Sequence, residues 1–328
     1  MPNRLIRDTV ILCKTEGASY GVDAAPTGAA DTMMVSNLSI TPLNGTFVDR
    51  DVIRSYLGGS EQLPGTRYIE MGFDVEITGT ASAGAAPKWL APMIGCGYTG
   101  TQSTTVRYDI TPVSAPGSVT IYWYDSGLLH KATGCRGTGT MTWGVNAIPK
   151  ASFRFTGIYS TPTVATPTGM DYTAWKQPQV VMDANTGSLS FGGTHALAPT
   201  APAIGGSPTV YPSQGLELDL GNTVNFTPLL DAETVDLTQR AVTGRVTLDL
   251  TAAEERTLMQ SVEGATTQSL ALLHGTRANE KVLIWMPSVQ LINPSKAESN
   301  GKRLVSFDLR VLPGTTGNDE LRLVTSFA

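Results

Sequence analysis

Residues 71–77 read Met-Gly-Phe-Asp-Val-Glu-Ile, so Met71, Phe73 and Val75 occupy alternate positions. Successive side chains of a β-strand point to opposite faces, so this alternation predicts a strand with one apolar and one polar face. Residues 246–250 (Val-Thr-Leu-Asp-Leu) repeat the alternation in the second half of the chain. The two stretches indicate a mainly β fold with related halves.

The composition agrees with a fold of short strands and turns. The 328 residues include 34 Gly and 20 Pro, Thr is the commonest residue, and 41% of the residues are hydrophobic. β-branched residues favour strands, whereas Gly and Pro favour turns. Only 16% of the residues are charged and the formal net charge is −5. This acidic balance argues against specific groove binding of nucleic acid, which needs a basic face.

Several further classes of protein are excluded on the same evidence. No apolar run approaches the roughly 20 residues that span a bilayer. Residues 1–5 lack the apolar core of an export signal, so synthesis in a reducing cytoplasm is expected. The three cysteines, Cys13, Cys96 and Cys135, have neither the spacing of a disulfide framework nor that of a zinc site. The sequence predicts no metal and no cofactor.

Catalytic motifs are missing or stand in the wrong context. Residues 95–100 (Gly-Cys-Gly-Tyr-Thr-Gly) have the spacing of a dinucleotide-binding turn. The expected helix precedes this turn and the expected strand follows it, which reverses the order that the chemistry needs. His130, His195 and His274 share no metal-ligand spacing, and no G-x-S-x-G nucleophile elbow occurs. We therefore expect a protein that is not an enzyme.

The two halves of the chain carry the same patterns in the same order. Near the start of each half, an apolar stretch leads to Ser, an aromatic residue and Gly, at residues 19–21 and 190–192. Each half continues through a period-2 strand and a short helix. Each closes on a matching strand, at residues 152–158 and 306–312. The shared order predicts an ancestral duplication.

The predicted helices and linkers divide the chain further. Thr251 and Glu254 form a capping box for the second helix. The Pro- and Thr-rich residues 161–176 are typical of a linker, which gives predicted domains at residues 1–160 and 177–328. A second Pro-rich stretch, residues 196–215, is predicted to be a loop within the second domain.

A family resemblance rests on several quoted stretches of the first half. They lie at residues 16–27 (EGASYGVDAAPT), 35–43 (VSNLSITPL), 48–58 (VDRDVIRSYLG), 86–90 (APKWL) and 128–137 (LLHKATGCRG). Together they resemble the major tail tube proteins of long-tailed bacteriophages of the siphovirus type. The resemblance covers about residues 10–160.

The resemblance implies a fold and a function. It implies two tandem tail-tube-like β-sandwich or barrel domains, each with one short flanking helix. Inner sheets would join around a ring, and stacked rings would form the virion tail tube through which DNA is ejected into the bacterial host. The implied partners are further copies of the chain, a tail terminator, a tape measure protein, distal tail or baseplate proteins and passing DNA, with no membrane. The duplication adds the hypothesis of three chains in a pseudo-sixfold ring, assembled in the host cytoplasm.

One set of candidate residues lies on the polar faces of the predicted strands. Such residues usually form an ordinary solvated face, but on a closed ring of strands one such face can line a lumen. Acidic and hydroxyl groups there would repel DNA weakly and let it slide. The predicted lumen residues are Glu70, Asp74, Glu76, Thr247, Asp249, Ser306 and Asp308.

A second set lies in two polar segments at equivalent places, residues 46–65 and 229–244. In the family, such an arm reaches a neighbouring subunit or ring. The predicted contact residues are Phe47, Val48, Ile53, Tyr56, Leu57, Leu229, Leu230, Val235 and Leu237.

Two other functions stay open at this point. A capsid decoration protein would share the composition and the lack of motifs. A carbohydrate-binding module would need exposed tryptophans among Trp89, Trp123, Trp143, Trp175 and Trp285.

Overall fold

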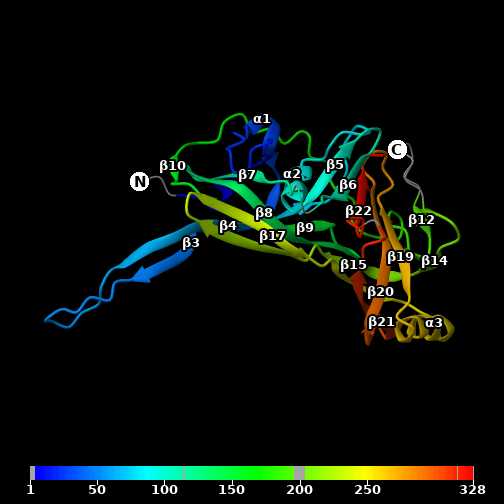
Figure 1. Cartoon of the computed structure of the whole chain (residues 1–328). Coiled ribbons are helices and arrows are strands. Elements are labelled where there is room, and N and C mark those ends of the chain that lie inside the picture. Colours follow the sequence, from blue (N-terminus) through cyan, green and yellow to red (C-terminus); the bar gives the residue numbers. More distant parts are fainter. Residues whose placement is uncertain (1–3, 113, 115, 196–203, 316, 328) are drawn as a thin grey trace.

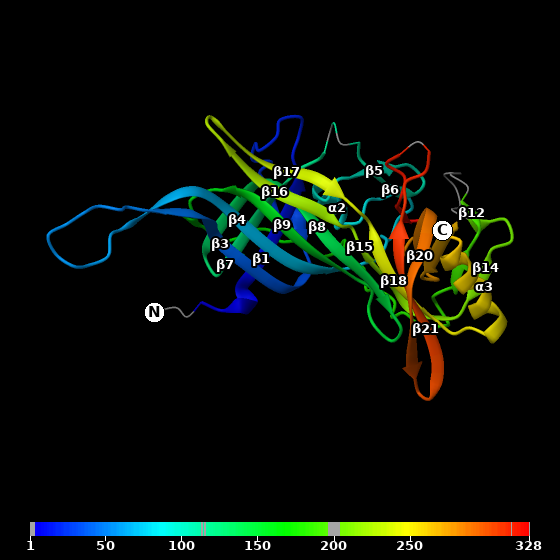
Figure 2. The same cartoon turned by 60° about the horizontal axis from the view of Figure 1, so that its bottom comes forward.

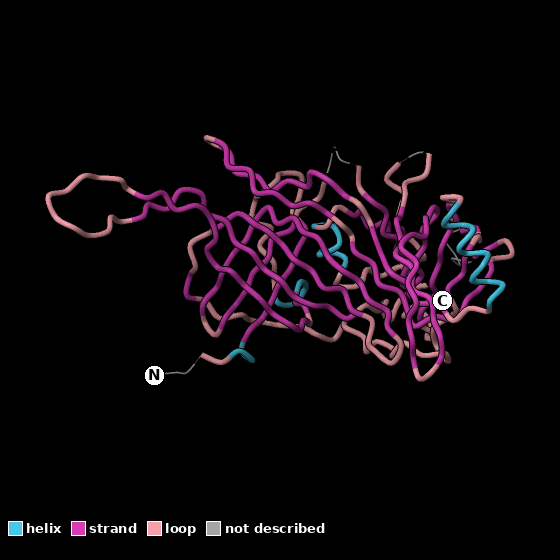
Figure 3. Tube along the Cα trace, turned by 90° about the horizontal axis from the view of Figure 1, so that it is seen from below, coloured by secondary structure: helices cyan, strands magenta, loops and turns pink. Residues whose placement is uncertain are grey.

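Antiparallel strands dominate the computed structural model, which describes residues 4–112, 114, 116–195, 204–315 and 317–327. Figures 1 and 3 show long strands crossing the molecule diagonally, with helices confined to a few short segments. The prediction of a mainly β fold is confirmed.

The first half of the chain supplies ten strands and three short helical segments to the described residues. The strands are β1 (Thr9–Thr15), β2 (Thr32–Met33), β3 (Val35–Asp49), β4 (Gln62–Glu76), β5 (Tyr98–Gln102), β6 (Val106–Ile110), β7 (Val119–Asp125), β8 (Leu128–Gly144), β9 (Lys150–Tyr159) and β10 (Thr163–Val164). The helical segments are η1 (Ile6–Asp8), α1 (Gly28–Asp31) and α2 (Leu90–Gly95).

The second half supplies the remaining strands and the longest helix of the described chain. The strands are β11 (Leu189–Phe191), β12 (Thr194–His195), β13 (Ile204–Gly205), β14 (Thr209–Tyr211), β15 (Ser213–Asp219), β16 (Asn222–Leu229), β17 (Ala232–Arg240), β18 (Thr243–Leu248), β19 (Thr267–His274), β20 (Val282–Ser299), β21 (Lys302–Val311) and β22 (Arg322–Thr325). The helix is α3 (Ala252–Glu263).

The strand pairings of the first half recur in the second half. The order β1-β7-β8-β9-β4-β3 matches the order β11-β19-β20-β21-β18-β15. A bulge interrupts both β3 and β15, and Asn37 and Gly215 within these bulges both have positive φ. A second bulge recurs between β7 and β8 and between β19 and β20. These matches support the predicted duplication.

One detail of the expected alignment of the halves is wrong. Tyr20 lies in a turn, whereas Phe191 lies in β11. Phe191 lies opposite Leu270, in the way that Cys13 of β1 lies opposite Ile121. The strand pairing therefore equates Phe191 with Cys13, because pairing partners and not local composition fix the equivalent positions.

A continuous sheet joins the two halves, and we call it the central sheet. Its strand order is β3-β4-β9-β8-β15-β18-β21-β20, and the halves meet where β8 pairs with β15. Its apolar face is buried in one core, which contains Phe73 and Phe153 from the first half and Leu218 and Phe307 from the second. The division into two tandem domains stays a prediction, since sheet and core run across it.

The predicted helix signals agree with the structure in the second half. Thr251 and Glu254 form both hydrogen bonds of the capping box, and Gly264 caps the other end of α3. In the predicted linker, β10 pairs with the edge of β8. Residues 196–203 of the predicted Pro-rich loop lie outside the described residues. The remainder, residues 204–215, is not simply a loop, because it holds β13, β14 and the start of β15.

Two hairpins extend from the central sheet. The first arm, residues 44–68, is the outer part of the β3–β4 hairpin and projects far from the rest of the molecule (Figures 1 and 2). The second arm, residues 222–240, is the β16–β17 hairpin. It contacts β8 and β9 of the first half, and its tip extends beyond the body of the molecule over a shorter length than the first arm does.

Candidate tube-lining face and arms

The polar face of the central sheet carries charges of both signs in register. Glu76 lies opposite Lys150 on one side of the sheet, and Glu217 lies opposite Arg245 on the other. Asp308 lies opposite Arg245 on its second side. Opposite charges on directly paired positions attract, so this row stabilises the sheet while leaving little net charge.

A second row of the same face is held by short side-chain contacts. Asp74 accepts a hydrogen bond from the Ser152 hydroxyl at 2.5 Å and another from the side-chain amide of Asn37. The register continues through Thr140 to Asp219. Two hydroxyl groups flanked by two carboxylates therefore form one row across the junction between the halves.

The predicted lumen residues of the second half lie at the same face. The Thr247 and Ser306 hydroxyls are 2.7 Å apart, and Ser306 is buried beneath this contact. Asp308 accepts a hydrogen bond from the Asn293 amide at 3.1 Å. Asp249 follows β18 and accepts from the Lys302 ammonium at 3.2 Å. Thr247, Ser306 and Asp308 thus lie on β18 and β21, whereas Asp249, predicted to lie on the same strand as Thr247, lies just beyond the end of that strand.

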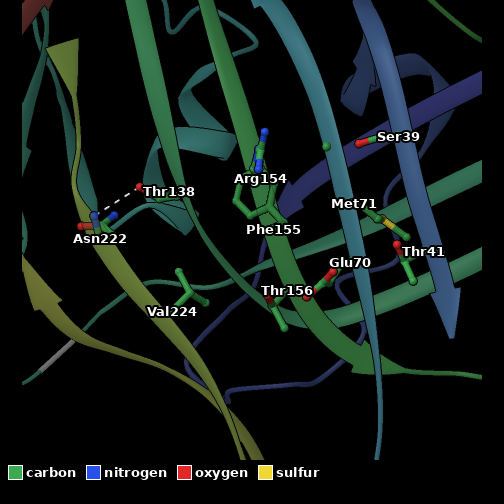
Figure 4. A pocket seen from close by; sticks show the side chains of 11 residues that line it. Ser39, Thr41, Glu70, Met71, Thr138, Arg154, Phe155, Thr156, Asn222 and Val224 are labelled. Carbon is green, nitrogen blue, oxygen red and sulfur yellow. Dashed lines mark hydrogen bonds between the residues drawn. The ribbon is translucent and has the colours of Figure 1, made fainter. Parts of the chain in front are cut away.

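A concave site lies on this face near the first arm. It has a volume of about 520 Å³, and Glu70, Arg154 and Thr156 line its floor. Asn222 and Val224 of β16 form one wall, and the Asn222 backbone amide donates to the Thr138 hydroxyl at 3.2 Å (Figure 4). Across the described residues, no group of three or more His, Cys, Asp or Glu side chains could hold a metal ion.

The tip of the first arm, residues 50–61, carries exposed apolar side chains among charged ones. Ile53 and Leu57 are fully exposed, and Tyr56 is two-thirds exposed. Glu61 forms ion pairs with Arg50 and Arg54, which close the base of the tip. Phe47 and Val48, nearer the sheet, are also exposed. Exposed apolar side chains in such number are typical of a contact surface.

The second arm has an exposed end and a buried base. Leu229 and Leu230 are exposed at its end, whereas Val235 is 0% exposed and Leu237 is half-buried. Val235 and Leu237 are thus packed within the chain, whereas Leu229 and Leu230 are free for contacts with other molecules.

Arg136 and Tyr20 of the first half bind the base of the second arm. The Arg136 guanidinium donates to the carbonyl oxygens of Val235 at 2.7 Å and Pro116 at 3.1 Å, and it stacks on Tyr20 at 4.6 Å. The Val235 backbone amide donates to the Tyr20 hydroxyl at 2.7 Å, and that hydroxyl donates to the Gly134 carbonyl at 3.0 Å. Burial raises the pKa of Tyr20, so its hydroxyl stays protonated and able to donate.

A family model described as phage tail tube protein matches residues 7–311. The chain belongs to the phage tail tube protein family. This tail tube protein is a structural component of a phage tail, as the quoted resemblance implied. A search of curated proteins found no match to the chain.

The polar face of this tail tube protein includes basic residues that the sequence analysis missed. They are Lys150, Arg154, Arg245 and Arg310. Two of these basic residues could have been assigned to the polar face from the sequence, because Arg154 and Arg310 lie at polar positions of the two matching strands at residues 152–158 and 306–312. The polar face in the structure therefore carries charges of both signs.

The tryptophans do not form an exposed platform. Four of them are buried in the core, and the fifth, Trp175, is partly buried and donates to the Thr32 carbonyl at 3.1 Å. The four are Trp89, Trp123, Trp143 and Trp285. Their burial counts against the carbohydrate-binding alternative. No helix among the described residues is long and apolar enough to cross a membrane.

Proposed function

We propose that this tail tube protein polymerises into rings of three chains that stack into the tail tube, and that phage DNA passes through the lumen during ejection. The observation that carries the proposal is the central sheet, which has one buried face and one polar face, an open edge along β3, and an open edge along the outer part of β20. Open strand edges with unpaired backbone groups are normally covered, and closure into a barrel covers them all.

The repeat within the sheet supports the proposed number of chains. Each half contributes four strands in matching order, β3-β4-β9-β8 and β15-β18-β21-β20. Three chains would supply six such units, which is the pseudo-sixfold ring. Native mass spectrometry of isolated rings tests this number, and a mass of six chains would refute it.

The polar face suits a surface along which DNA slides. Acidic residues exceed basic ones on it, so the net interaction with phosphate would be weakly repulsive. Interspersed acidic groups also break up the basic residues, so that no continuous basic track can hold the DNA backbone. The lumen residues would be the predicted set together with Glu217 and Asp219, which share its face.

The remaining details of the proposal come from the family resemblance. The tube would end against a tail terminator and against distal tail or baseplate proteins, and it would enclose a tape measure protein. Assembly would take place in the cytoplasm of the bacterial host. The siphovirus type of tail stays a prediction.

Electron microscopy of the purified protein at high concentration tests assembly, since a decoration protein would form no tubes. Function of the lumen is tested in phage carrying Asp74→Lys and Glu76→Lys. We expect normal tails but at least tenfold lower DNA ejection, because added lysines would bind phosphate. The control is Asp183→Lys with Glu263→Lys, which adds the same charge at exposed positions outside the central sheet. Equal ejection by both variants would refute the lumen assignment.

A further inference from the structure

We propose that the β8–β15 junction, with the second arm packed beside it, is an internal copy of the contact between neighbouring chains. In the ring, β3 of one chain would pair with the outer part of β20 of the next, and the first arm would dock on that neighbour's second half. This inference rests on the proposed ring, and it adds the partner surface and the register.

The first step equates β8 with β20. In the first half, Thr140 of β8 lies opposite Ser152 of β9. In the second half, Ser295 of β20 lies opposite Ser306 of β21. Ser152 and Ser306 begin the matching strands that close the two halves. Ser295 is therefore the counterpart of Thr140.

The second step equates β3 with β15. Asn37 and Gly215 mark the same bulge with positive φ in these strands. Counting four residues onward from each gives Thr41 and Asp219 as counterparts. Asp219 lies opposite Thr140 at the junction inside the chain. The same register between chains places Thr41 opposite Ser295 of the next molecule.

The third step is that both edges are open. Among the described strands, β3 pairs along its length only with β4, on one side. Residues 291–299 of β20 pair only with β21. Open edges of this length attract a further strand. The junction inside the chain shows how the strand between chains would pair, because β15 pairs with the edge of β8 that corresponds to the open edge of β20.

The arms give independent support. In the second arm, Phe226 lies opposite Val235, which is 0% exposed, and Phe226 stacks on Tyr68 at 5.1 Å. In the first arm the corresponding pair is Val48 and Leu63, which are 58% and 51% exposed. The second arm is covered by the half that precedes it across the junction. The equivalent cover for the first arm is the second half of a neighbouring chain.

Disulfide trapping tests the register. The variant pairs Thr41→Cys with Ser295→Cys, and the internal control pairs Thr140→Cys with Asp219→Cys. Directly opposite residues of antiparallel strands have the Cα separation that a disulfide requires. The native cysteines are all buried, and burial raises the pKa of their thiols, so they contribute little background.

After oxidation with copper phenanthroline, we expect most of the test variant to run as covalent dimers and trimers in a denaturing gel without reductant. The control should form its bond within one chain and stay at monomer mass. Moving one cysteine out of register, with Thr41→Cys and Glu298→Cys, should lower the covalent oligomers at least fivefold.

The outcomes separate this inference from the proposed function. Tubes without in-register cross-links overturn the register and leave the tube standing. Cross-links without tubes support the register and overturn the tube. If neither tubes nor in-register cross-links form, both the proposed tube and the proposed register are overturned. The arm contact is tested with Leu63→Asp, which should reduce assembly at least tenfold, against Val164→Asp, an exposed position on β10. Equal assembly by both variants would overturn the arm contact.

Discussion

Replacing Arg136 with Met should destabilise the folded chain through the base of the second arm. Arg136 is only 9% exposed, and its guanidinium donates two good hydrogen bonds to carbonyl oxygens of Val235 and Pro116, at 2.7 and 3.1 Å. Hydrogen bonds to a charged group contribute about 1.5–3 kcal/mol each. Part of this is offset, because Met avoids the cost of burying a charge. We expect a net loss of about 3 kcal/mol, or a melting temperature lower by about 6 °C.

The assay is thermal and urea unfolding together with limited proteolysis by thermolysin. If the arm loosens, cleavage should appear at Val235 and Leu237, which are buried or half-buried in the wild type. The control is Arg154→Met, because Arg154 is exposed on the polar face and its loss should cost under about 0.5 kcal/mol. A loss below about 1 kcal/mol for Arg136→Met, or unchanged cleavage, would refute the anchoring role.

Three further predictions concern other parts of the chain. Replacing the tip at residues 50–61 by Asn-Gly should leave the melting temperature within about 2 °C, since the tip side chains make few contacts within the chain. Rings should still form, but the tubes should be shorter. Tubes of normal length in electron micrographs would contradict this. Thr251→Ala should cost about 1 kcal/mol in urea unfolding by removing the cap of α3, and Thr257→Ala, within the same helix, should cost less. His274→Gln should reduce the loss of stability in acid.

The sign of the last effect follows from burial of the imidazole. His274 contacts the Thr186 hydroxyl at 2.8 Å and the Gln179 carbonyl at 3.1 Å, and desolvation lowers its pKa below the ordinary value of 6.5. The unfolded chain binds the proton more readily, so stability is full above about pH 7 and falls as the pH drops through 6.5 toward the folded pKa. Identical pH profiles of unfolding for His274→Gln and wild type would contradict this.

Strand faces could be predicted from the sequence because alternation is a local property. Met71 and Phe73 are buried, and Asp74 lies on the opposite face. The helix cap at Thr251 was likewise readable, because both partners lie within one turn. Each of these features depends on residues that are close in the chain.

Long-range features were not readable in the same way. The two arms occupy similar places in the sequence, yet the second is held by Arg136 and Tyr20, which are far from Val235 along the chain, whereas the tip of the first is exposed. The equivalence of Tyr20 and Phe191 failed because only strand pairing fixes the register of the halves. The pairing of opposite charges across the polar face, such as Glu76 with Lys150 and Glu217 with Arg245, depends on which strands are neighbours, and the sequence does not give this.

The covalent link between the halves would change how the proposed ring assembles. Each association of separate molecules costs at least about 4 kcal/mol of translational and rotational freedom. The β8–β15 junction forms within one chain as it folds, so it carries no such association cost. Only the junctions between chains, half of those in the proposed ring, would form by association of separate molecules. The link also lets the two arms diverge. With the long tip on the first arm alone, the surface that meets the next ring would repeat with threefold rather than sixfold periodicity, which would restrict how successive rings can rotate against each other.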